Sequence, residues 1–282
     1  MTWWQSIILG IVEGVTEFLP VSSTGHLTIT EKLMGMPIDD PGITAYTAII
    51  QIGAILAAVI YFWNDIARIG AAFLKGLGNK DARDADYNMG WAVVVGTVIT
   101  AGVALLGKDL ITGALRSMWV VAIGLIVWSF AMFAADRHAA KVPASKQRTL
   151  ETITWKDGAI LGAVQCLSLV PGVSRSGATI TGGLFSGLDR LAATKLSFYL
   201  GIPALVAAGC YEAASEFTHV SNTIGWGVTI IGMVVSFFVA YASIAWLLKF
   251  VASNTFTSFV VYRIVVGVAI IGLLVSNVIT AV

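Results

Sequence analysis

Six long apolar stretches dominate the sequence, and each has about the length of a membrane-spanning helix. They cover residues 43–63, 89–107, 118–135, 191–212, 225–248 and 256–280. An α-helix needs about 20 mostly apolar residues to cross a bilayer. Charged residues make up only 12% of the chain and hydrophobic residues 57%, whereas soluble domains have about 25% and 45–50%. Such a chain cannot cover its surface with polar groups, so we expect an all-α polytopic membrane protein with six transmembrane helices.

Two further apolar segments, 3–34 and 157–188, are interrupted near their middle. The interruptions read LPVSSTG at 19–25 and PGVSRSG at 171–177. Proline removes a backbone donor and disfavours helix in the residue before it, whereas serine can cap a helix that follows. Irregular backbone inside a bilayer is stable only where it is buried in protein or lines a wet cavity. We therefore expect two re-entrant helical hairpins, which enter the membrane and return.

Basic residues gather in two of the loops, 64–88 and 136–156. Two spans separate these loops, so both lie on one side of the membrane, and the positive-inside rule makes that side the cytoplasm. Counting spans from there puts both chain termini outside. The first 17 residues lack the basic start and the small-residue cleavage site of a signal peptide, so we expect them to be retained.

A shift of 152 positions aligns the two interrupted segments without a gap. The coinciding pairs are Ile8-Leu9-Gly10 with Ile160-Leu161-Gly162, Val12 with Val164, Glu13 with Gln165, Thr16 with Ser168, Val21 with Val173, Ser22 with Ser174 and Gly25 with Gly177. Each half holds one hairpin and three spans, and an odd number of spans inverts the second copy. We expect a single membrane domain of inverted-topology repeats, with repeat one at about 3–135, a basic cytoplasmic linker at 136–156 and repeat two at about 157–282.

Two carboxylates, Glu13 and Glu17, lie four positions apart in the first hairpin and so share one helix face. A carboxylate inside a bilayer costs about 2.5–3.5 kcal/mol on insertion scales. Two adjacent carboxylates also repel each other unless a cation or a proton lies between them. The pair therefore predicts a divalent-cation site, or a general base, and the alternative is a pair in the headgroup region.

Hydroxyl groups and a histidine follow directly, at Ser22, Ser23, Thr24 and His26. One hydroxyl can cap the next helix and leave another free to act as a nucleophile beside a carboxylate or an imidazole. His26 is suited to general acid or base catalysis near neutral pH. The alternative for His26 is a structural role, in which the ring satisfies a buried backbone carbonyl.

Arg175 is the only arginine in either interrupted segment. Its planar guanidinium matches phosphate oxygens bidentately. The neighbours are hydroxyl-bearing or small: Ser174, Ser176, Gly177 and Thr179. Exposed amides at a helix start, together with hydroxyls and a glycine, are typical of an anion site. An ion pair between Arg175 and Glu17 or Glu13 is the alternative, and the two interpretations are compatible in a resting state.

These groups together predict phosphate-ester or diphosphate chemistry. At these same residues the sequence also resembles a known protein family. The motifs EGVTEFLPVSSTGH at 13–26 and PGVSRSGAT at 171–179 resemble those of the bacterial undecaprenyl-diphosphate phosphatase family, of the bacitracin-resistance type. The resemblance covers nearly the whole chain; at Ser168 we would expect a small apolar residue instead. The resemblance implies hydrolysis of undecaprenyl diphosphate to undecaprenyl phosphate and inorganic phosphate, a reaction that recycles the lipid carrier for cell-wall synthesis.

The resemblance also implies roles for residues and a cofactor. Glu13 and Glu17 form its acidic motif, Ser23 is the expected nucleophile and His26 a catalytic partner. The diphosphate-binding group is Ser174, Arg175 and Thr179, together with the neighbouring Ser176. A divalent cation, Mg²⁺ or Ca²⁺, is expected at the acidic motif, and the protein is expected in the bacterial plasma (inner) membrane.

The expected cavity opens to the outer face, because the first hairpin enters from outside and carries the ionisable groups. Ionised carboxylates need water or ions nearby, whereas the second hairpin has Gln165, Leu169 and Ala178 at the corresponding positions. The partners are then a polyprenyl diphosphate and membrane lipid, and the net charge of +1 argues against a nucleic acid. The oligomeric state is left open, a homodimer included.

Two other function classes use similar features. A secondary transporter or lipid flippase would have the same inverted repeats, with Arg175 holding an anion and the glutamates carrying protons. The broader lipid-phosphatase superfamily also pairs Ser-Gly-His with Ser-Arg, but its Lys-x₆-Arg-Pro element is absent from this sequence.

Overall fold

The computed structural model describes residues 1–37, 40–107, 115 and 117–281, and within them the secondary structure is helical apart from one isolated bridge between Arg148 and Leu188. Among these described residues, six helices are long and apolar enough to cross a membrane. They are α3 (Pro41–Tyr61), α5 (Ala85–Leu106), α7 (Met118–Lys141), α10 (Arg190–Asn222, of which Arg190–Ser215 qualifies), α11 (Trp226–Val251) and α12 (Thr257–Val275). The predicted all-helical class and the six predicted spans are confirmed.

Both interrupted segments form two helices separated by a turn. The first consists of α1 (Trp3–Thr16) and α2 (Ser23–Leu33), and the second of α8 (Trp155–Gln165), the 3₁₀ turn η4 (Cys166–Leu169) and α9 (Arg175–Phe185). The prolines Pro20 and Pro171 lie inside the two turns, where their lack of a backbone N–H costs no helical hydrogen bond.

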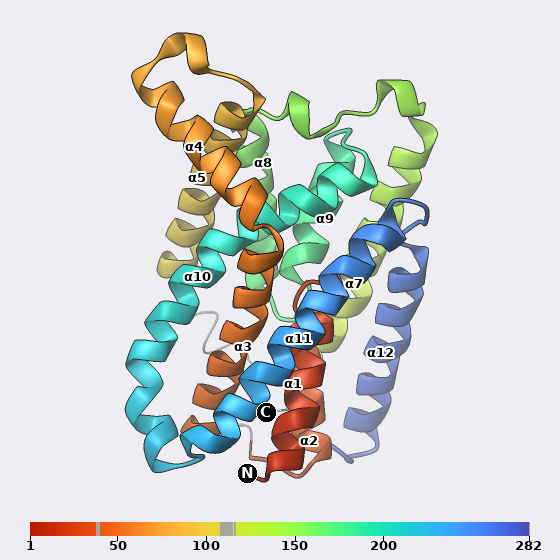
Figure 1. Ribbon diagram of the computed structural model, residues 1–282. Coiled ribbons are helices and arrows are strands. Elements are labelled where there is room, and N and C mark those ends of the chain that lie inside the picture. The colour runs from red at the N-terminus through yellow and green to blue at the C-terminus, as the bar shows by residue number, and fades with distance from the viewer. Residues whose placement is uncertain (38–39, 108–114, 116, 282) are drawn as a thin grey trace.

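Each of the helices that leads into a turn packs closely on a long helix from the other half of the sequence. A β-carbon at Gly10 of α1 would lie 2.6 Å from the carbonyl oxygen of Gly232 in α11. A β-carbon at Gly162 of α8 would lie 2.6 Å from Cα of Gly96 in α5. Only glycine allows such backbone contact. The two halves are therefore interlocked (Figure 1).

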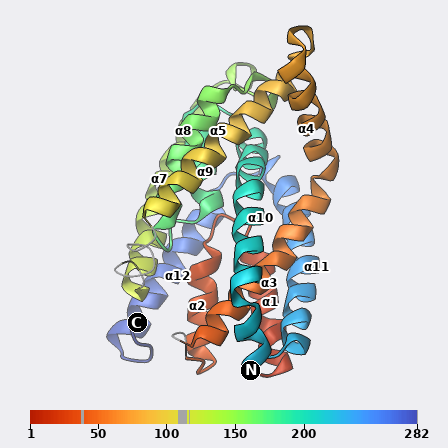
Figure 2. The same cartoon turned by 90° about the vertical axis from the view of Figure 1, so that its left-hand side faces the viewer.

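The ends of the molecule differ in charge. The helix α4 (Trp63–Gly78), the 3₁₀ turn η1 (Lys80–Ala82) and the segment 142–154 lie at one end, and the chain termini lie at the other (Figures 1 and 2). The segment 142–154 contains the 3₁₀ turns η2 (Ala144–Lys146) and η3 (Leu150–Thr152). Both predicted basic loops are thus at the same end, as the span count requires.

Two predicted loops contain more helix than the sequence pattern indicated. Residues 64–88 include α4, in which Ile69 is buried while Leu74 is 69% exposed. Apolar residues at helical spacing stabilise it against the neighbouring helices, although with 16 residues it is shorter than any of the six candidate spans. The predicted loop 213–224 is mostly the end of α10, which continues to Asn222.

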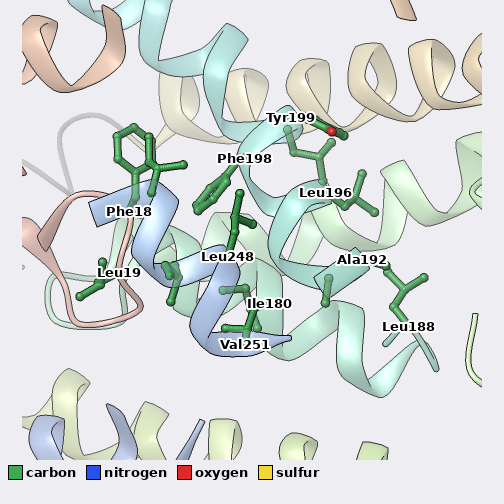
Figure 3. Close-up of a cluster of buried hydrophobic side chains, with 14 of the residues drawn as sticks. Phe18, Leu19, Ile180, Leu188, Ala192, Leu196, Phe198, Tyr199, Leu248 and Val251 are labelled. Carbon is green, nitrogen blue, oxygen red and sulfur yellow. The ribbon is translucent and has the colours of Figure 1, made fainter. Parts of the chain in front are cut away.

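A buried apolar cluster lies next to the first turn (Figure 3). Phe18 and Leu19 of that turn contact side chains from α9, α10 and α11, among them Ile180, Phe198 and Leu248. The rings of Phe18 and Phe198 meet edge to face with centroids 5.4 Å apart. This packing fixes the turn from the inside and orients the neighbouring Glu17 toward polar partners.

Candidate active site

The carboxylate of Glu17 joins polar groups from both interrupted segments. Glu17 follows directly after α1 and is 6% exposed. Its Oε2 accepts hydrogen bonds from the Ser23 hydroxyl at 2.7 Å and from the Gln51 amide at 3.2 Å. Its Oε1 lies 3.4 Å from Nη2 of Arg175. A single carboxylate therefore contacts a hydroxyl from α2, an amide from α3 and a guanidinium from α9.

These groups line a mostly polar cavity of about 140 Å³ between the two turns. Ser23 and Thr24 contribute from one segment, and Ser174 and Arg175 from the other. Because α2 begins at Ser23 and α9 begins at Arg175, the N-terminal ends of two helices meet the cavity. Helix N-termini present unpaired amides and a partial positive charge. The cavity is therefore suited to an anion.

Glu13 lies one helical turn before Glu17, whose backbone N–H donates to the Glu13 carbonyl at 2.9 Å. Its side chain is only 1% exposed to solvent. Glu13 lines a second cavity of about 220 Å³, which shares Ser23 and Gln51 with the first. The sequence prediction that the two glutamates share one face is consistent with this geometry.

The residues just before the second helices have the same unusual backbone. Ser22 has φ 76° and Ser174 has φ 77°, in the left-handed region that non-glycine residues rarely adopt. Such a conformation costs about 1–3 kcal/mol and is found mainly at functional sites. The Ser174 hydroxyl accepts a hydrogen bond from the Gly177 amide, as predicted for a cap, whereas the Ser22 side chain makes no capping bond.

Arg175 keeps part of its donor capacity unused. Its Nη1 donates to the carbonyl of Ser197 at 3.2 Å, and its guanidinium carbon lies 5.7 Å from the ring centre of Phe18. Its buried Nε has no hydrogen-bond partner among the described residues. The 3.4 Å contact with Glu17 is long for a charge-assisted hydrogen bond, which is typically about 2.7–2.9 Å. The ion pair considered as an alternative is present, and it leaves the guanidinium able to bind an anion.

The other predicted diphosphate ligands differ in their access to the cavity. Ser174 lines it, and its hydroxyl pairs with that of Ser176 at 3.1 Å. Ser176 also donates to the carbonyl of Leu19 at 3.0 Å and so connects the two turns. Thr179 donates to Gln165 and to the Arg175 carbonyl. Ser176 and Thr179 are fully buried and do not line the cavity, so the geometry gives them a supporting position.

His26 is engaged through both ring nitrogens. Nδ1 lies 2.8 Å from the carbonyl oxygen of Ser22, and Nε2 lies 2.8 Å from the hydroxyl of Tyr262. Since a carbonyl can only accept, Nδ1 carries the proton, and a neutral ring then accepts from Tyr262 at Nε2. His26 does not line the cavity that contains Glu17. Its contacts correspond to the structural alternative, because they hold the strained Ser22 next to Ser23.

Sequence reasoning missed three residues at the site. Gln51, which donates to Glu17, is a single amide in an apolar span. Gly201, whose backbone lies against the Arg175 guanidinium, is one of many glycines. Neither residue therefore has a distinctive signal in the sequence. Arg263 was detectable: it is an arginine inside the predicted span 256–280, and ionisable residues inside membranes are functional candidates by default. Its side chain is fully buried.

The donor set around Glu13 and Glu17 fits a hard cation. Among the described residues there is no group of three or more His, Cys, Asp and Glu side chains able to hold a metal. The two carboxylates, the Ser23 hydroxyl and the Gln51 amide are nevertheless oxygen-bearing groups around neighbouring cavities. Mg²⁺ is usually held by one or two carboxylates together with water and substrate phosphates. The residues present therefore suffice for a cation that a diphosphate helps to bind.

Comparison with known proteins agrees with this geometry. Residues 6–269 match the family model described as bacitracin resistance protein BacA. The undecaprenyl-diphosphatase of Cutibacterium acnes is 55% identical over 289 aligned positions, covering 100% of both chains. Undecaprenyl-diphosphatase 1 of Streptomyces avermitilis is 49% identical and covers 98% of both. The undecaprenyl-diphosphatase of a Mycobacterium species is 43% identical and covers 100% of both. The chain belongs to the BacA family of bacitracin resistance proteins.

Proposed function

We propose that this protein hydrolyses undecaprenyl diphosphate to undecaprenyl phosphate and inorganic phosphate, and so recycles the lipid carrier for cell-wall synthesis. The relatives named above are undecaprenyl-diphosphatases that match over the whole chain. The observation that carries the proposal is the Glu17 carboxylate, which holds the Ser23 hydroxyl at 2.7 Å and faces Arg175 across one cavity. In this proposal Ser23 is the nucleophile, Glu17 the base and Arg175 the phosphate-binding group, and the three lie at one cavity.

Ser23 is the nucleophile in this proposal. Its Oγ attacks the terminal phosphorus while its proton passes to Oε2 of Glu17, to which it is already hydrogen-bonded. The bond between that phosphorus and the bridging oxygen breaks, and undecaprenyl phosphate leaves. After Glu17 has lost its proton to solvent, it deprotonates a water molecule that hydrolyses the phosphoserine. As the bond between phosphorus and Oγ breaks, Glu17 returns this proton to Oγ, so that inorganic phosphate is released and the Ser23 hydroxyl is restored.

Arg175 neutralises the phosphoryl oxygens. Its Nε is unpartnered among the described residues and its contact with Glu17 is long, so an incoming phosphate can replace Glu17 as its partner. The N-terminal ends of α2 and α9 add amides to the same cavity. Ser174 lies within reach of the diphosphate in this arrangement, while Ser176 and Thr179 support the turn from behind. His26 holds the backbone next to the nucleophile.

Glu13 and Glu17 are the residues that would hold a divalent cation, Mg²⁺ or Ca²⁺. When bound, such a cation supplies charge neutralisation for the diphosphate oxygens. Glu13, 1% exposed and lining the neighbouring cavity, keeps that region negative and therefore selective for cations over a second anion.

The proposal includes the membrane arrangement. Repeat one (3–135) and repeat two (157–282) are inverted copies joined by the linker 136–156, and each contributes a re-entrant hairpin whose turn lies near the bilayer midplane. Two observations support it: Ser22 and Ser174 share one backbone conformation at aligned positions, and Gly10 and Gly162 are aligned residues with equivalent close contacts. The proposal also allows a homodimer. Light scattering of the purified protein measures the oligomeric state.

The site opens to the outer face of the inner membrane. The cavity lined by Glu13 shares Thr28 and Thr47 with a third cavity of about 210 Å³, which reaches Ser117 and Ala281. Ala281 directly precedes the C-terminal residue and accepts a hydrogen bond from the N–H of Met118, the residue after Ser117, at 2.8 Å. This cavity therefore reaches the end that carries the termini, opposite the basic segments (Figures 1 and 2). The positive-inside rule makes the basic end cytoplasmic, so the route leads outward.

Inorganic phosphate release tests the function. Purified protein in detergent, supplied with undecaprenyl diphosphate, is expected to release one phosphate per substrate. A transporter or flippase needs two compartments and would release none in detergent. Absence of phosphate release under these conditions would overturn the proposal.

A further inference from the structure

Arg263 is a fully buried cation in the middle of α12. The helix packs on α7 (Figure 1). None of the ion pairs found among the described residues includes Arg263, so its charge is not balanced by a neighbouring carboxylate there. Burying a guanidinium without an acidic partner is costly, and its partners should therefore show what it is for.

Those partners include the backbones of both turns, besides longer contacts of Nη2 with the α7 carbonyls of Gly124 at 3.5 Å and Leu125 at 3.4 Å. Nη1 donates to the carbonyl oxygen of Pro20 at 2.9 Å, and Nη2 donates to the carbonyl oxygen of Gly172 at 2.9 Å. Nε donates to the hydroxyl of Ser129 in α7 at 3.1 Å, which orients the planar group. The two carbonyls are aligned by the shift of 152 positions, and each lies two residues before a strained serine.

A guanidinium is rigid, so it fixes the separation of the two carbonyls that it bridges. Pro20 is three residues before Ser23, and Gly172 is three residues before Arg175. The nucleophile and the phosphate-binding group come from different segments and face each other only if the two turns keep one relative position. Small misplacements of reacting groups are expensive: about 1 Å can lower a rate by roughly 100-fold.

We propose that Arg263 is a positioning residue that clamps the two turns, so that Ser23 and Arg175 are held in register across the cavity. This rests on the proposed hydrolysis, in which Ser23 and Arg175 act on the same phosphoryl group. Arg263 does not line the cavity. It acts through the backbone of Gly172, which does line it, and of Pro20, which lies two residues before the cavity residue Ser22.

Arg263→Lys tests the clamp, because lysine keeps the charge but has no planar fork to hold both carbonyls. We expect kcat to fall about 10- to 100-fold and KM to change less than about threefold, since the binding groups themselves remain. In an Arg175→Ala background, Arg263→Lys is expected to lower kcat little further, because the register no longer matters. If Arg263 were merely structural, Arg263→Lys would lower kcat by the same factor in the wild-type protein and in Arg175→Ala.

Arg148→Lys is the matched control. Arg148 also donates to backbone carbonyls, those of Thr152 and Ser186, and binds Asp157, but it lies outside the cavity. The substitution Arg148→Lys should reduce thermal stability without changing the kcat of the folded protein. Unchanged kcat in Arg263→Lys, or an equal loss in the Arg148 control, would overturn the clamp.

A second measurement does not depend on turnover. Spin labels at Leu33 and Leu167, both exposed, report on the two segments in protein with Cys166→Ser and Cys210→Ser. The distance distribution should broaden in Arg263→Lys and stay narrow in Arg148→Lys. Broadening in a protein that releases no phosphate would support the clamp while refuting the proposed hydrolysis. An unchanged distribution would refute the clamp, whatever the activity.

Discussion

The guanidinium of Arg175 lies against the bare backbone of Gly201 in α10, where a β-carbon would overlap Nη1. The adjoining turn of α10 supplies the Ser197 carbonyl that accepts from the same nitrogen. Gly201 therefore provides the space in which Arg175, the proposed phosphate-binding arginine, rests.

Gly201→Ala is accordingly expected to displace Arg175 and to lower kcat by about 10- to 100-fold, because the displacement is of the order of 1 Å or more. Phosphate release from detergent-purified protein measures the effect. Gly209→Ala in the same helix is the control, since its β-carbon would meet only side-chain atoms of Ile55, at 3.1 Å, and Ile52, at 3.4 Å. Equal activity of the two variants would show that the resting position of Arg175 is not needed.

Removing the proposed nucleophile Ser23, the proposed base Glu17 or the proposed phosphate-binding Arg175 should lower activity severely. Ser23→Ala, Glu17→Gln and Arg175→Ala are each expected to lower kcat by about 10²–10⁴-fold, because a base and a charge-stabilising group each contribute on that scale. All three variants should still insert and purify, since their side chains face a cavity. Near-normal turnover of Ser23→Ala would instead assign the attack to His26 or to a water molecule.

The sequence predicted the spans and the two breaks because these follow from local rules. Length and apolarity define a span, and Pro20 and Pro171 cannot continue a helix, so both features are visible without tertiary contacts. The extension of α10 beyond residue 212 was not predicted, because its polar end is stabilised by helix continuity rather than by apolarity.

The site was predicted in its residue types and in one contact, the ion pair between Arg175 and Glu17 that was considered as an alternative. Glu17 and Arg175 were identified from charge and spacing, whereas Ser23 was one of a cluster of hydroxyls that the family resemblance singled out; the structure brings the three together. That Gln51 donates to Glu17, and that His26 is held by Tyr262, depends on residues 34 and 236 positions away in the chain. Sequence periodicity does not reveal such pairs. Arg263 could have been found, because an arginine inside an apolar span is visible in the sequence even though the mean hydropathy of the span hides it.

A divalent cation should be required for turnover. Exhaustive chelation is expected to abolish phosphate release, and Mg²⁺ or Ca²⁺ to restore it, because Glu13 and Glu17 offer oxygen ligands that hard cations prefer. The helical content of the chelated protein, followed by circular dichroism, should stay unchanged. Full activity after chelation would leave the glutamates as proton carriers only.

The basic end of the molecule should face the cytoplasm. Cysteines introduced at Lys80 and Lys146, in protein with Cys166→Ser and Cys210→Ser, are expected to resist a membrane-impermeant thiol reagent in intact cells. A cysteine at the exposed Thr218, near the other end of α10, should react. Labelling of position 80 or 146 from outside would reverse the assigned orientation.

The final prediction concerns the side on which the product appears. The ionisable groups Glu13, Glu17 and His26 all belong to the first interrupted segment, and the cavities that continue from it reach Ser117 and Ala281 at the end that carries the termini. Ionised carboxylates require water, so we expect this to be the hydrated side, and the positive-inside rule predicts that it is the outer one. Sealed right-side-out vesicles supplied with external undecaprenyl diphosphate should therefore release phosphate into the outer medium. Inverted vesicles from the same preparation should release it into the lumen only if the lipid has first crossed the membrane. Phosphate found only in the lumen of right-side-out vesicles would mean that the site opens to the cytoplasm, and the argument from carboxylate hydration would then be wrong.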